Sequence, residues 1–182
     1  GRVYCWTSGF LQSFFRSFMK HTEVVEFLSK ITNKKKAKIL ASFFKTGNGQ
    51  YGEGDIFIGV IVPDQRKIAI KCSELALVEI QKLLKSNIHE HRLTALLILV
   101  NKFNTLWTSD VHNNERNKIR IFDFYIKNTK YINNWDLVDL SASNIVGRYL
   151  YHEKRDILYK LAKSKNLWER RIAVLATFMF IR

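Results

Sequence analysis

Apolar residues recur every three or four positions along most of the chain, which is the spacing of one face of an α-helix. Only residues 55–62 have the composition of a strand, and a single strand cannot form a sheet. The pattern therefore predicts an all-α fold. The expected helices cover residues 23–31, 34–40, 64–70, 74–85, 87–103, 114–127, 135–146, 153–162 and 168–182.

Residues at the expected helix ends support these bounds. Thr22 and Ser73 each precede a helix and can cap it by accepting a backbone N–H bond. Pro63 suits the first turn of the third helix, and Gly147 suits the C-terminal end of the seventh. The glycine-containing loop of residues 47–55 separates the second helix from the third.

One pattern occurs twice. Residues 83–92 read L-L-K-S followed by N-x-x-E-x-R, and residues 161–171 read L-A-K-S followed, after one more residue, by the same pattern. Glu90 and Glu169 lie 79 positions apart, which is two units of about 40 residues, the period of HEAT-type helix pairs. In both copies an Asn three residues before the Glu predicts a variant of the capping box. Such pairs stack into a HEAT-like helical repeat solenoid, whose concave face is lined by the second helix of each pair.

The charge balance indicates a class of partner. The chain has 30 Lys and Arg against 16 Asp and Glu, a formal net charge of +14. Because 47% of its residues are hydrophobic and 13% aromatic, a disordered basic tail is excluded. One Pro and eight Gly argue against a turn-rich β-sandwich or barrel. A concave basic face would suit the phosphate backbone of a duplex.

Cysteine use and hydropathy indicate the compartment. Cys5 and Cys72 make neither a disulfide framework nor a zinc cluster, so we expect a reducing, intracellular location. The best apolar run, residues 96–100, is far shorter than the roughly 20 residues of a membrane span, so no membrane association is expected. The chain begins without Met and without a signal-peptide cleavage site, so we expect a fragment or a processed chain.

Two motifs that suggest cofactors do not fit their context. Residues 47–52 match G-x-G-x-x-G, but the dinucleotide fingerprint needs a strand before it and a helix after it, and here a helix precedes it and loop follows. His89 and His91 are two positions apart and would point about 200° apart on a helix, so they cannot share a metal ion. Helix capping and solvent exposure are expected for them instead. We therefore expect neither a metal nor a cofactor, nor a nucleophilic Ser or Cys with a His partner.

The helix expected from Trp135 carries a different arrangement. Asp136 in its first turn is stabilised by the helix dipole, which is a structural role. Asp139 lies one turn after Trp135, so the carboxylate and the indole share one face. An acid beside an aromatic ring can stabilise a developing cation, as glycosidase carboxylates do. The alternative is that Trp135 belongs to the core and that Asp139 pairs with a nearby Arg.

Four stretches together resemble one known family, the AlkD-like DNA alkylation repair proteins, which are glycosylases built of HEAT-like repeats. In this sequence they are F-F-K-T-G followed by Y-G-E-G-D-x-F-x-G-V, H-E-x-R-x-x-A-L, N-W-D-L-V-D, and L-W-E-R-R-x-A. They occupy residues 43–60, 89–96, 134–139 and 167–173. The resemblance covers roughly residues 20–182; residues 1–20 match nothing and are expected to form an N-terminal helix or a flexible segment. Residues 21–182 are expected to be the repair domain, truncated at its C-terminus.

The resemblance implies roles for individual residues. It implies that Asp139 is catalytic, that Trp135 packs against the sugar, and that Arg171 is the active-site Arg, with its neighbour Arg170 as the second choice. Tyr51 matches an aromatic residue of the family that lies near the lesion. The family excises positively charged purines from double-stranded DNA, typically 3-alkyladenine and 7-alkylguanine, without metal or cofactor. A monomer in a bacterial cytoplasm or nucleoid is expected.

Other functions and one further site stay open. A HEAT-repeat scaffold could bind DNA by shape and charge without catalysis, or the fold could bind an acidic protein. A basic run can contact phosphates, or it can simply be a solvated helix face. The residues of this run are Lys34, Lys35, Lys36 and Lys38.

Overall fold

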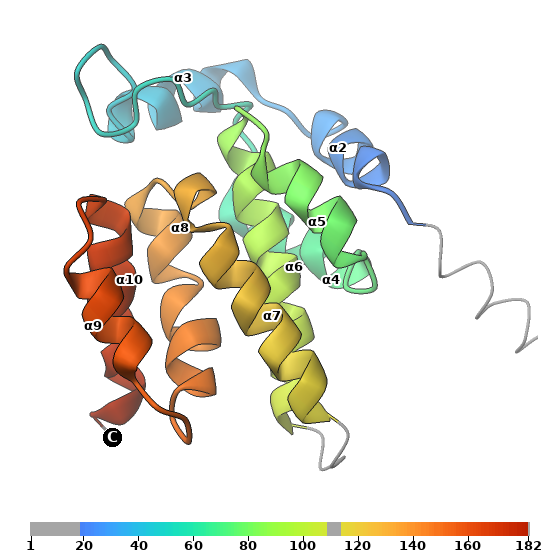
Figure 1. Cartoon of the computed structure of the whole chain (residues 1–182). Helices are drawn as coiled ribbons and strands as arrows, with labels where there is room; N and C mark the ends of the chain where they lie inside the picture. The colour runs from blue at the N-terminus through green and yellow to red at the C-terminus, as the bar shows by residue number, and fades with distance from the viewer. Residues whose placement is uncertain (1–18, 109–113, 182) are drawn as a thin grey trace, which may run out of the picture.

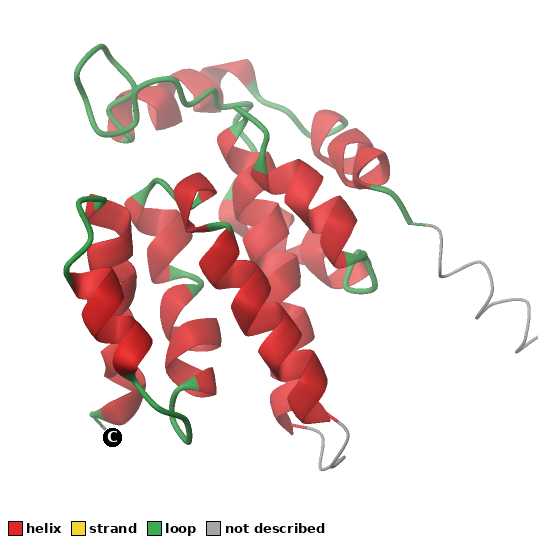
Figure 2. Cartoon of the chain, in the orientation of Figure 1, coloured by secondary structure: helices red, strands yellow, loops and turns green. Residues whose placement is uncertain are grey.

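The computed structural model describes residues 19–108 and 114–181, and within them every regular element is a helix (Figure 2). The expected all-α fold is therefore confirmed, whereas a HEAT-like solenoid stays a prediction. The expected N-terminal segment, residues 1–20, falls almost entirely outside the described residues. The α-helices are α2 (His21–Ser29), α3 (Lys34–Phe43), α4 (Val62–Lys71), α5 (Leu77–Leu84), α6 (His89–Thr108), α7 (Glu115–Lys127), α8 (Trp135–Asp139), α9 (Asp156–Ala162) and α10 (Leu167–Ala176). Shorter turns are the 3₁₀-helices Thr129–Tyr131 and Thr177–Phe180 and the π-helix Ser143–Gly147.

Helix α6 is the centre of the fold. It packs against α4 and α5 on one side and against α7 on another, while α9 packs against α10 (Figure 1). Residues 89–100, the first three turns of α6, are all buried. They include Leu96–Val100, the apolar run noted in the sequence. Helix α3 lies across one end of this helical layer, above α6 and α8 (Figure 1). The basic helix thus lies on the surface while the apolar helix forms the core.

Neither Thr22 nor Ser73 caps its helix as expected. Helix α2 begins before Thr22, and the side chain of Glu23 accepts the backbone N–H of Lys20 at 3.0 Å. Helix α5 begins after Ser73, whose carbonyl oxygen accepts a bond from Lys102 Nζ at 2.9 Å. Pro63 is in the first turn of α4 as expected. Ser73 lies in the turn between α4 and α5, where its carbonyl oxygen binds a lysine of α6, and a local pattern does not show this.

The helix expected over residues 135–146 is interrupted. Helix α8 ends at Asp139, and a π-helical turn follows from Ser143. The break lies at Ser141, whose Oγ donates to the carbonyl oxygen of Leu137 at 2.5 Å and lies 2.8 Å from Tyr125 Oη. A serine that bonds back to the preceding turn bends a helix. The interruption leaves Asp139 at an exposed helix end.

The start of α3 is held against the segment that precedes α4. Asn33 N–H donates to the carbonyl oxygen of Ile58 at 2.9 Å, and Gly59 adopts a φ of +82°. A Cβ at Gly59 would lie 2.1 Å from Asn33 O, which no side chain can occupy. The segment of residues 55–62 forms no strand in the described part of the chain; it makes one isolated parallel bridge, between Ile56 and Ile88.

The two copies of the sequence pattern share local bonds, but in a different register. Arg92 donates to the carbonyl oxygen of Ser86 at 2.9 Å, and Arg170 donates to that of Ser164 at 2.8 Å. By these bonds Arg92 corresponds to Arg170, not to Arg171 as the sequence alignment of the repeat had it. Arg170 therefore makes the repeat's structural bond, and Arg171 binds Asp139 instead.

The glutamates of the two copies do not complete capping boxes. Asn166 caps α10 by accepting the N–H of Trp168, but Glu169 accepts a bond from Thr129 Oγ1 at 2.7 Å. Glu90 accepts bonds from the backbone of residues 58–60. Both carboxylates therefore join separate segments of the chain instead of closing their own helix.

Candidate functional site

Helix α8 places an indole and a carboxylate one turn apart. Asn134 caps the helix by accepting the N–H of Trp135 at 2.8 Å, and Asp139 is the last helical residue. Because α8 runs from Trp135 to Asp139, the two residues lie one helical turn apart, as expected. Trp135 is half-buried, because its ring packs at 5.3 Å against Phe44 and at 6.0 Å against Phe43.

Asp139 forms a two-pronged ion pair with Arg171 of α10. Arg171 Nε donates to Oδ1 at 2.7 Å and Nη2 donates to Oδ2 at 2.8 Å. The hydrogen bond to Asp139 raises the pKa of Arg171 above its usual value. The Asp139 and Arg171 side chains are 34% and 40% exposed, so the carboxylate is accessible from solvent. The ion pair is compatible with a catalytic and with a structural Asp139, because Arg171 could form it in either role.

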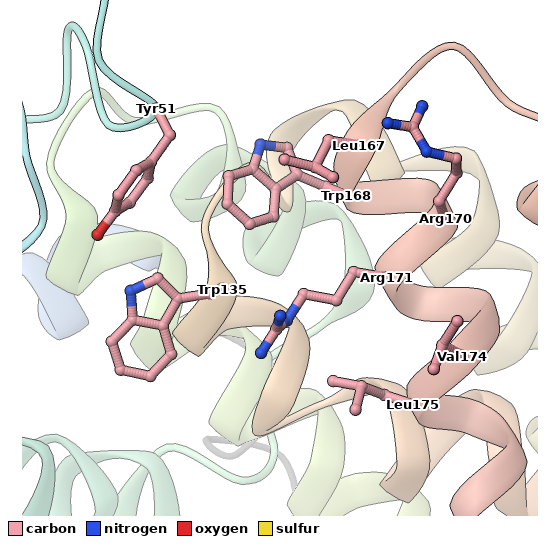
Figure 3. Close-up of a pocket in the computed structure, with 8 residues that line it drawn as sticks. All are labelled: Tyr51, Trp135, Leu167, Trp168, Arg170, Arg171, Val174 and Leu175. Carbon is pink, nitrogen blue, oxygen red and sulfur yellow. The ribbon is translucent and has the colours of Figure 1, made fainter.

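A pocket of about 560 Å³ lies next to this pair (Figure 3). Three aromatic rings and the Arg171 side chain project into it, and Arg171 extends toward Trp135 (Figure 3). Because the walls are mainly aromatic and aliphatic while one guanidinium borders them, the pocket suits a flat group close to an anion. The lining residues are Tyr51, Trp135, Leu167, Trp168, Arg170, Arg171, Val174 and Leu175.

Tyr51 reaches the pocket from the loop between α3 and α4. Its ring lies 6.1 Å from that of Trp168, edge to face, and it is 39% exposed. The loop is held close to α3 at Gly52, where a Cβ would lie 2.3 Å from the carbonyl oxygen of Phe44. The G-x-G-x-x-G match of residues 47–52 is thus part of a tight loop after a helix, the context in which it does not bind a dinucleotide.

Comparison with models of protein families shows which family this chain belongs to. The family described as DNA alkylation repair enzyme matches residues 24–182, which is most of the chain. The chain belongs to this family. No curated protein matches it. The resemblance read from the four sequence stretches is confirmed at the level of the family, and DNA alkylation repair implies DNA as substrate or partner.

The structure places the other predicted DNA-binding residues outside the pocket interior. Arg170 borders the pocket, but its guanidinium donates to the carbonyl oxygens of Ser164 and Lys165 and points away from Trp135 (Figure 3). The four lysines of α3 are exposed, and none lines the pocket. They lie on the helix whose last residue, Phe43, contacts Trp135. Their contact with DNA stays a prediction.

Trp168 is a site residue that was not predicted from the sequence. It is the second residue of α10, half-buried, and its ring forms one wall of the pocket beside Tyr51. A signal was present, because Trp168 lies three residues before Arg171 and so shares its helix face. In this repair protein the pocket therefore has indoles from two helices, α8 and α10.

The expected exposure of His89 and His91 is wrong. Both are buried, with 1% and 7% of their surface exposed. His89 lies between Asp55 and Asp136, and His91 lies 3.0 Å from Ser86 Oγ. Asp136 therefore has a second role besides its place in the first turn of α8. Both faces of the start of α6 are covered by other segments, which the spacing of the two histidines could not show.

Two further observations concern the described part of this repair protein. No group of three or more His, Cys, Asp and Glu side chains within residues 19–108 and 114–181 could hold a metal ion. None of the helices there combines the length and the hydropathy needed to cross a membrane.

Proposed function

We propose that this chain is a DNA N-glycosylase that releases cationic alkylated purines, such as 3-alkyladenine and 7-alkylguanine, from duplex DNA. One observation carries the proposal: a solvent-accessible carboxylate, Asp139, is held one helical turn from an indole at an aromatic pocket. Family membership supports DNA as the partner. The pocket is lined by three aromatic rings together with aliphatic side chains, which fits a flat base that is already positively charged.

The reaction needs little acid catalysis. A purine alkylated at N3 or N7 carries a positive charge, so it leaves as a neutral base when the bond from C1′ to nitrogen breaks and the base keeps the electron pair. The sugar then carries positive charge, and water adds at C1′ and loses a proton. The Asp139 carboxylate would stabilise that charge and accept a hydrogen bond from the attacking water.

The other residues of the pocket would hold the substrate. The π-faces of Trp135, Trp168 and Tyr51 favour a cationic sugar or base. Arg171 uses Nε and Nη2 to hold Asp139, so Nη1 belongs to neither of those bonds and can face a phosphate next to the lesion. Arg171 thus fixes the carboxylate while it contributes to DNA binding.

Base release is the direct test. Methylated duplex DNA is incubated with excess protein, and released 3-methyladenine and 7-methylguanine are quantified by chromatography. We expect release from methylated duplex, none from unmethylated duplex, and no requirement for added metal. Release of neither base, together with duplex binding that weakens steeply with salt, would instead indicate a non-catalytic DNA-binding scaffold.

The exposed lysines of α3 lead to a prediction about affinity. Replacing Lys34, Lys35, Lys36 and Lys38 with Gln should weaken binding to undamaged duplex and make it less dependent on salt. Each lost phosphate contact removes about 0.9 from the slope of log K against log salt concentration. The lesion preference should not change, because none of the four lines the pocket. Binding is measured by fluorescence anisotropy over a range of salt concentrations.

A matched variant removes the same charge elsewhere. Four exposed lysines that do not line the pocket are likewise changed to Gln, so that net charge falls equally in both proteins. Equal loss of slope in the two variants would show that α3 acts only through overall charge. The control residues are Lys127, Lys154, Lys160 and Lys163.

A further inference from the structure

Four ionisable side chains are buried together at the start of α6 and α8. They come from three elements: Asp55 from the loop before α4, His89 and Arg92 from α6, and Asp136 from α8. Each is at most 9% exposed. Buried charges are costly unless each is paired, so this cluster needs a reason beyond packing.

Both ring nitrogens of His89 face carboxylate oxygens. Nδ1 lies 3.1 Å from Asp55 Oδ2, and Nε2 lies 2.7 Å from Asp136 Oδ2. A carboxylate only accepts hydrogen bonds, and a neutral imidazole has only one N–H to donate. Both contacts are therefore satisfied at once only by the doubly protonated, positively charged ring. Arg92 supplies the second cation, since its Nη2 donates to Asp55 Oδ1 at 2.7 Å.

The surroundings of the ring favour that charge. Burial opposes it, but the hydrogen bonds to Asp136 and Asp55 outweigh burial, so the pKa of His89 is raised above its usual value of 6.5. The pKa of Asp55 is lowered, because its bonds to His89 and the charge of Arg92 outweigh its own burial. The next acid on α6, Glu90, is occupied by the backbone of residues 58–60.

The polar side of the cluster faces a second, smaller pocket. It measures about 290 Å³ and is bordered by Asp55 and Arg92. Asn134 also donates to Asp55 Oδ2, at 3.4 Å. The His89 ring itself packs against aromatic rings. The other charged residues around this pocket are Glu53, Lys85 and Lys130.

A column of rings connects His89 to Trp135. Phe57 stacks on the His89 ring at 4.5 Å, and Phe44 lies 5.0 Å from it. Phe44 in turn stacks on Trp135 at 5.3 Å. A second connection runs through the backbone, because Asp136 directly follows Trp135 in α8. His89 therefore contacts the start of α8 both by a hydrogen bond and through packed rings.

We infer that the charged His89 ring is a positioning residue, which holds α8 so that Trp135 lines the pocket and Asp139 stays paired with Arg171 beside it. The inference rests on the proposed function only for its effect on excision. Helix α8 has five residues, too few to be stable alone, so its position depends on contacts such as the bond from His89 to Asp136. A neutral ring would leave one carboxylate facing a nitrogen lone pair, and α8 would shift.

The inference predicts a dependence on pH. Because the pKa of His89 is raised on folding, the stabilisation by its charge is complete below about pH 6.5 and is lost as pH rises through the raised pKa. Excision should fall over the same range. Asp136→Asn should remove this dependence: Asn keeps an oxygen for the N–H of Leu137 and offers an N–H to a neutral His89 ring.

The experiment observes Trp135 directly, so that it does not depend on catalysis. The chain is labelled with 5-fluorotryptophan, the Trp135 signal is assigned with a Trp135→Phe variant, and the nitrogen shifts of His89 are recorded in the same pH series. We expect His89 to be charged at pH 7 and the Trp135 signal to shift as His89 loses its proton. In Asp136→Asn the Trp135 signal should not change with pH.

Variants provide the controls at a fixed pH of 7. His89→Gln should shift the Trp135 signal and slow single-turnover excision by about 10- to 100-fold, the scale of a misplacement by about 1 Å. His91→Gln is the matched control, since His91 is buried on the same helix turn but bonds to a serine hydroxyl, and it should leave the Trp135 signal in place. Circular dichroism checks that each variant is folded.

Three results would overturn the inference: a neutral His89 at pH 7, a Trp135 signal that is the same in His89→Gln as in wild type, or an Asp136→Asn protein that titrates like wild type. If His89→Gln does not fold, the pH titrations of the Trp135 signal in the wild type and in Asp136→Asn still test the inference. Coupled shifts of His89 and Trp135 without any base release would leave the positioning role intact and refute the glycosylase proposal alone.

Discussion

Asp139→Asn should slow single-turnover excision by about 100-fold or more, the scale at which a preorganised electrostatic group acts on a transition state. Asn keeps the shape of the side chain and one acceptor oxygen for Arg171, but it removes the negative charge that would face the sugar. The effect is measured as base release from methylated duplex with enzyme in excess, so that product release does not limit the rate. Unchanged activity would refute the catalytic assignment of Asp139.

Stability and DNA affinity should change little in the same variant. The pair with Arg171 is about one third exposed on each side, and an ion pair screened by solvent in this way contributes about 0–1 kcal/mol. Affinity for undamaged duplex should hold or rise slightly, because an acid is removed near phosphates. A large fall in melting temperature would show that Asp139 is structural. Asp123→Asn, an exposed acid on α7 away from the pocket, is the matched control.

The sequence predicted the pieces of the candidate site that depend on local geometry. Trp135 and Asp139 are four positions apart, so any helix through them brings the indole and the carboxylate together. The pairing of Asp139 with an Arg could be anticipated as a type of contact. Which Arg it would be came from the family resemblance, since Arg171 is 32 positions away and the contact depends on how α8 and α10 pack.

What the sequence could not predict depends on tertiary packing. The spacing of His89 and His91 correctly argues against one shared metal, but it does not say that other segments cover both faces of α6. Glu90 matches a capping box by its spacing, yet its carboxylate binds the loop 31 residues upstream at Gly59. The break at Ser141 depends on its bond back to the preceding turn, beside Tyr125 of the neighbouring helix. At the two histidines and at Glu90 the difference comes from tertiary contacts, whereas the break at Ser141 combines a local bond to Leu137 with a tertiary contact to Tyr125.

Glu90→Ala should destabilise the fold more than any other single change considered for this chain. The Glu90 carboxylate is 1% exposed and accepts three backbone N–H groups: Ile58 at 3.1 Å, Gly59 at 2.8 Å and Val60 at 3.3 Å. Alanine leaves all three without an acceptor, and each buried unsatisfied group costs about 1–3 kcal/mol. The expected loss of several kcal/mol is comparable with the total stability of about 5–15 kcal/mol of an ordinary domain.

The repeat supplies a matched control for this prediction. Glu169 occupies the position of Glu90 in the second copy of the sequence pattern, but among the residues that the structure describes it accepts one bond, from the hydroxyl of Thr129. Glu169→Ala should therefore cost about 1 kcal/mol, the net value of one ordinary hydrogen bond. Glu90→Gln, which keeps one acceptor oxygen, should fall between the two alanine variants. Urea unfolding followed by circular dichroism measures all three, and equal losses for Glu90→Ala and Glu169→Ala would contradict the assignment.

Loss of Glu90 should also release the basic helix α3 from the rest of the fold. The reason is that Ile58, whose N–H binds Glu90, also accepts the N–H of Asn33 at the start of α3. In Glu90→Ala, amide hydrogen exchange should therefore rise first in α3.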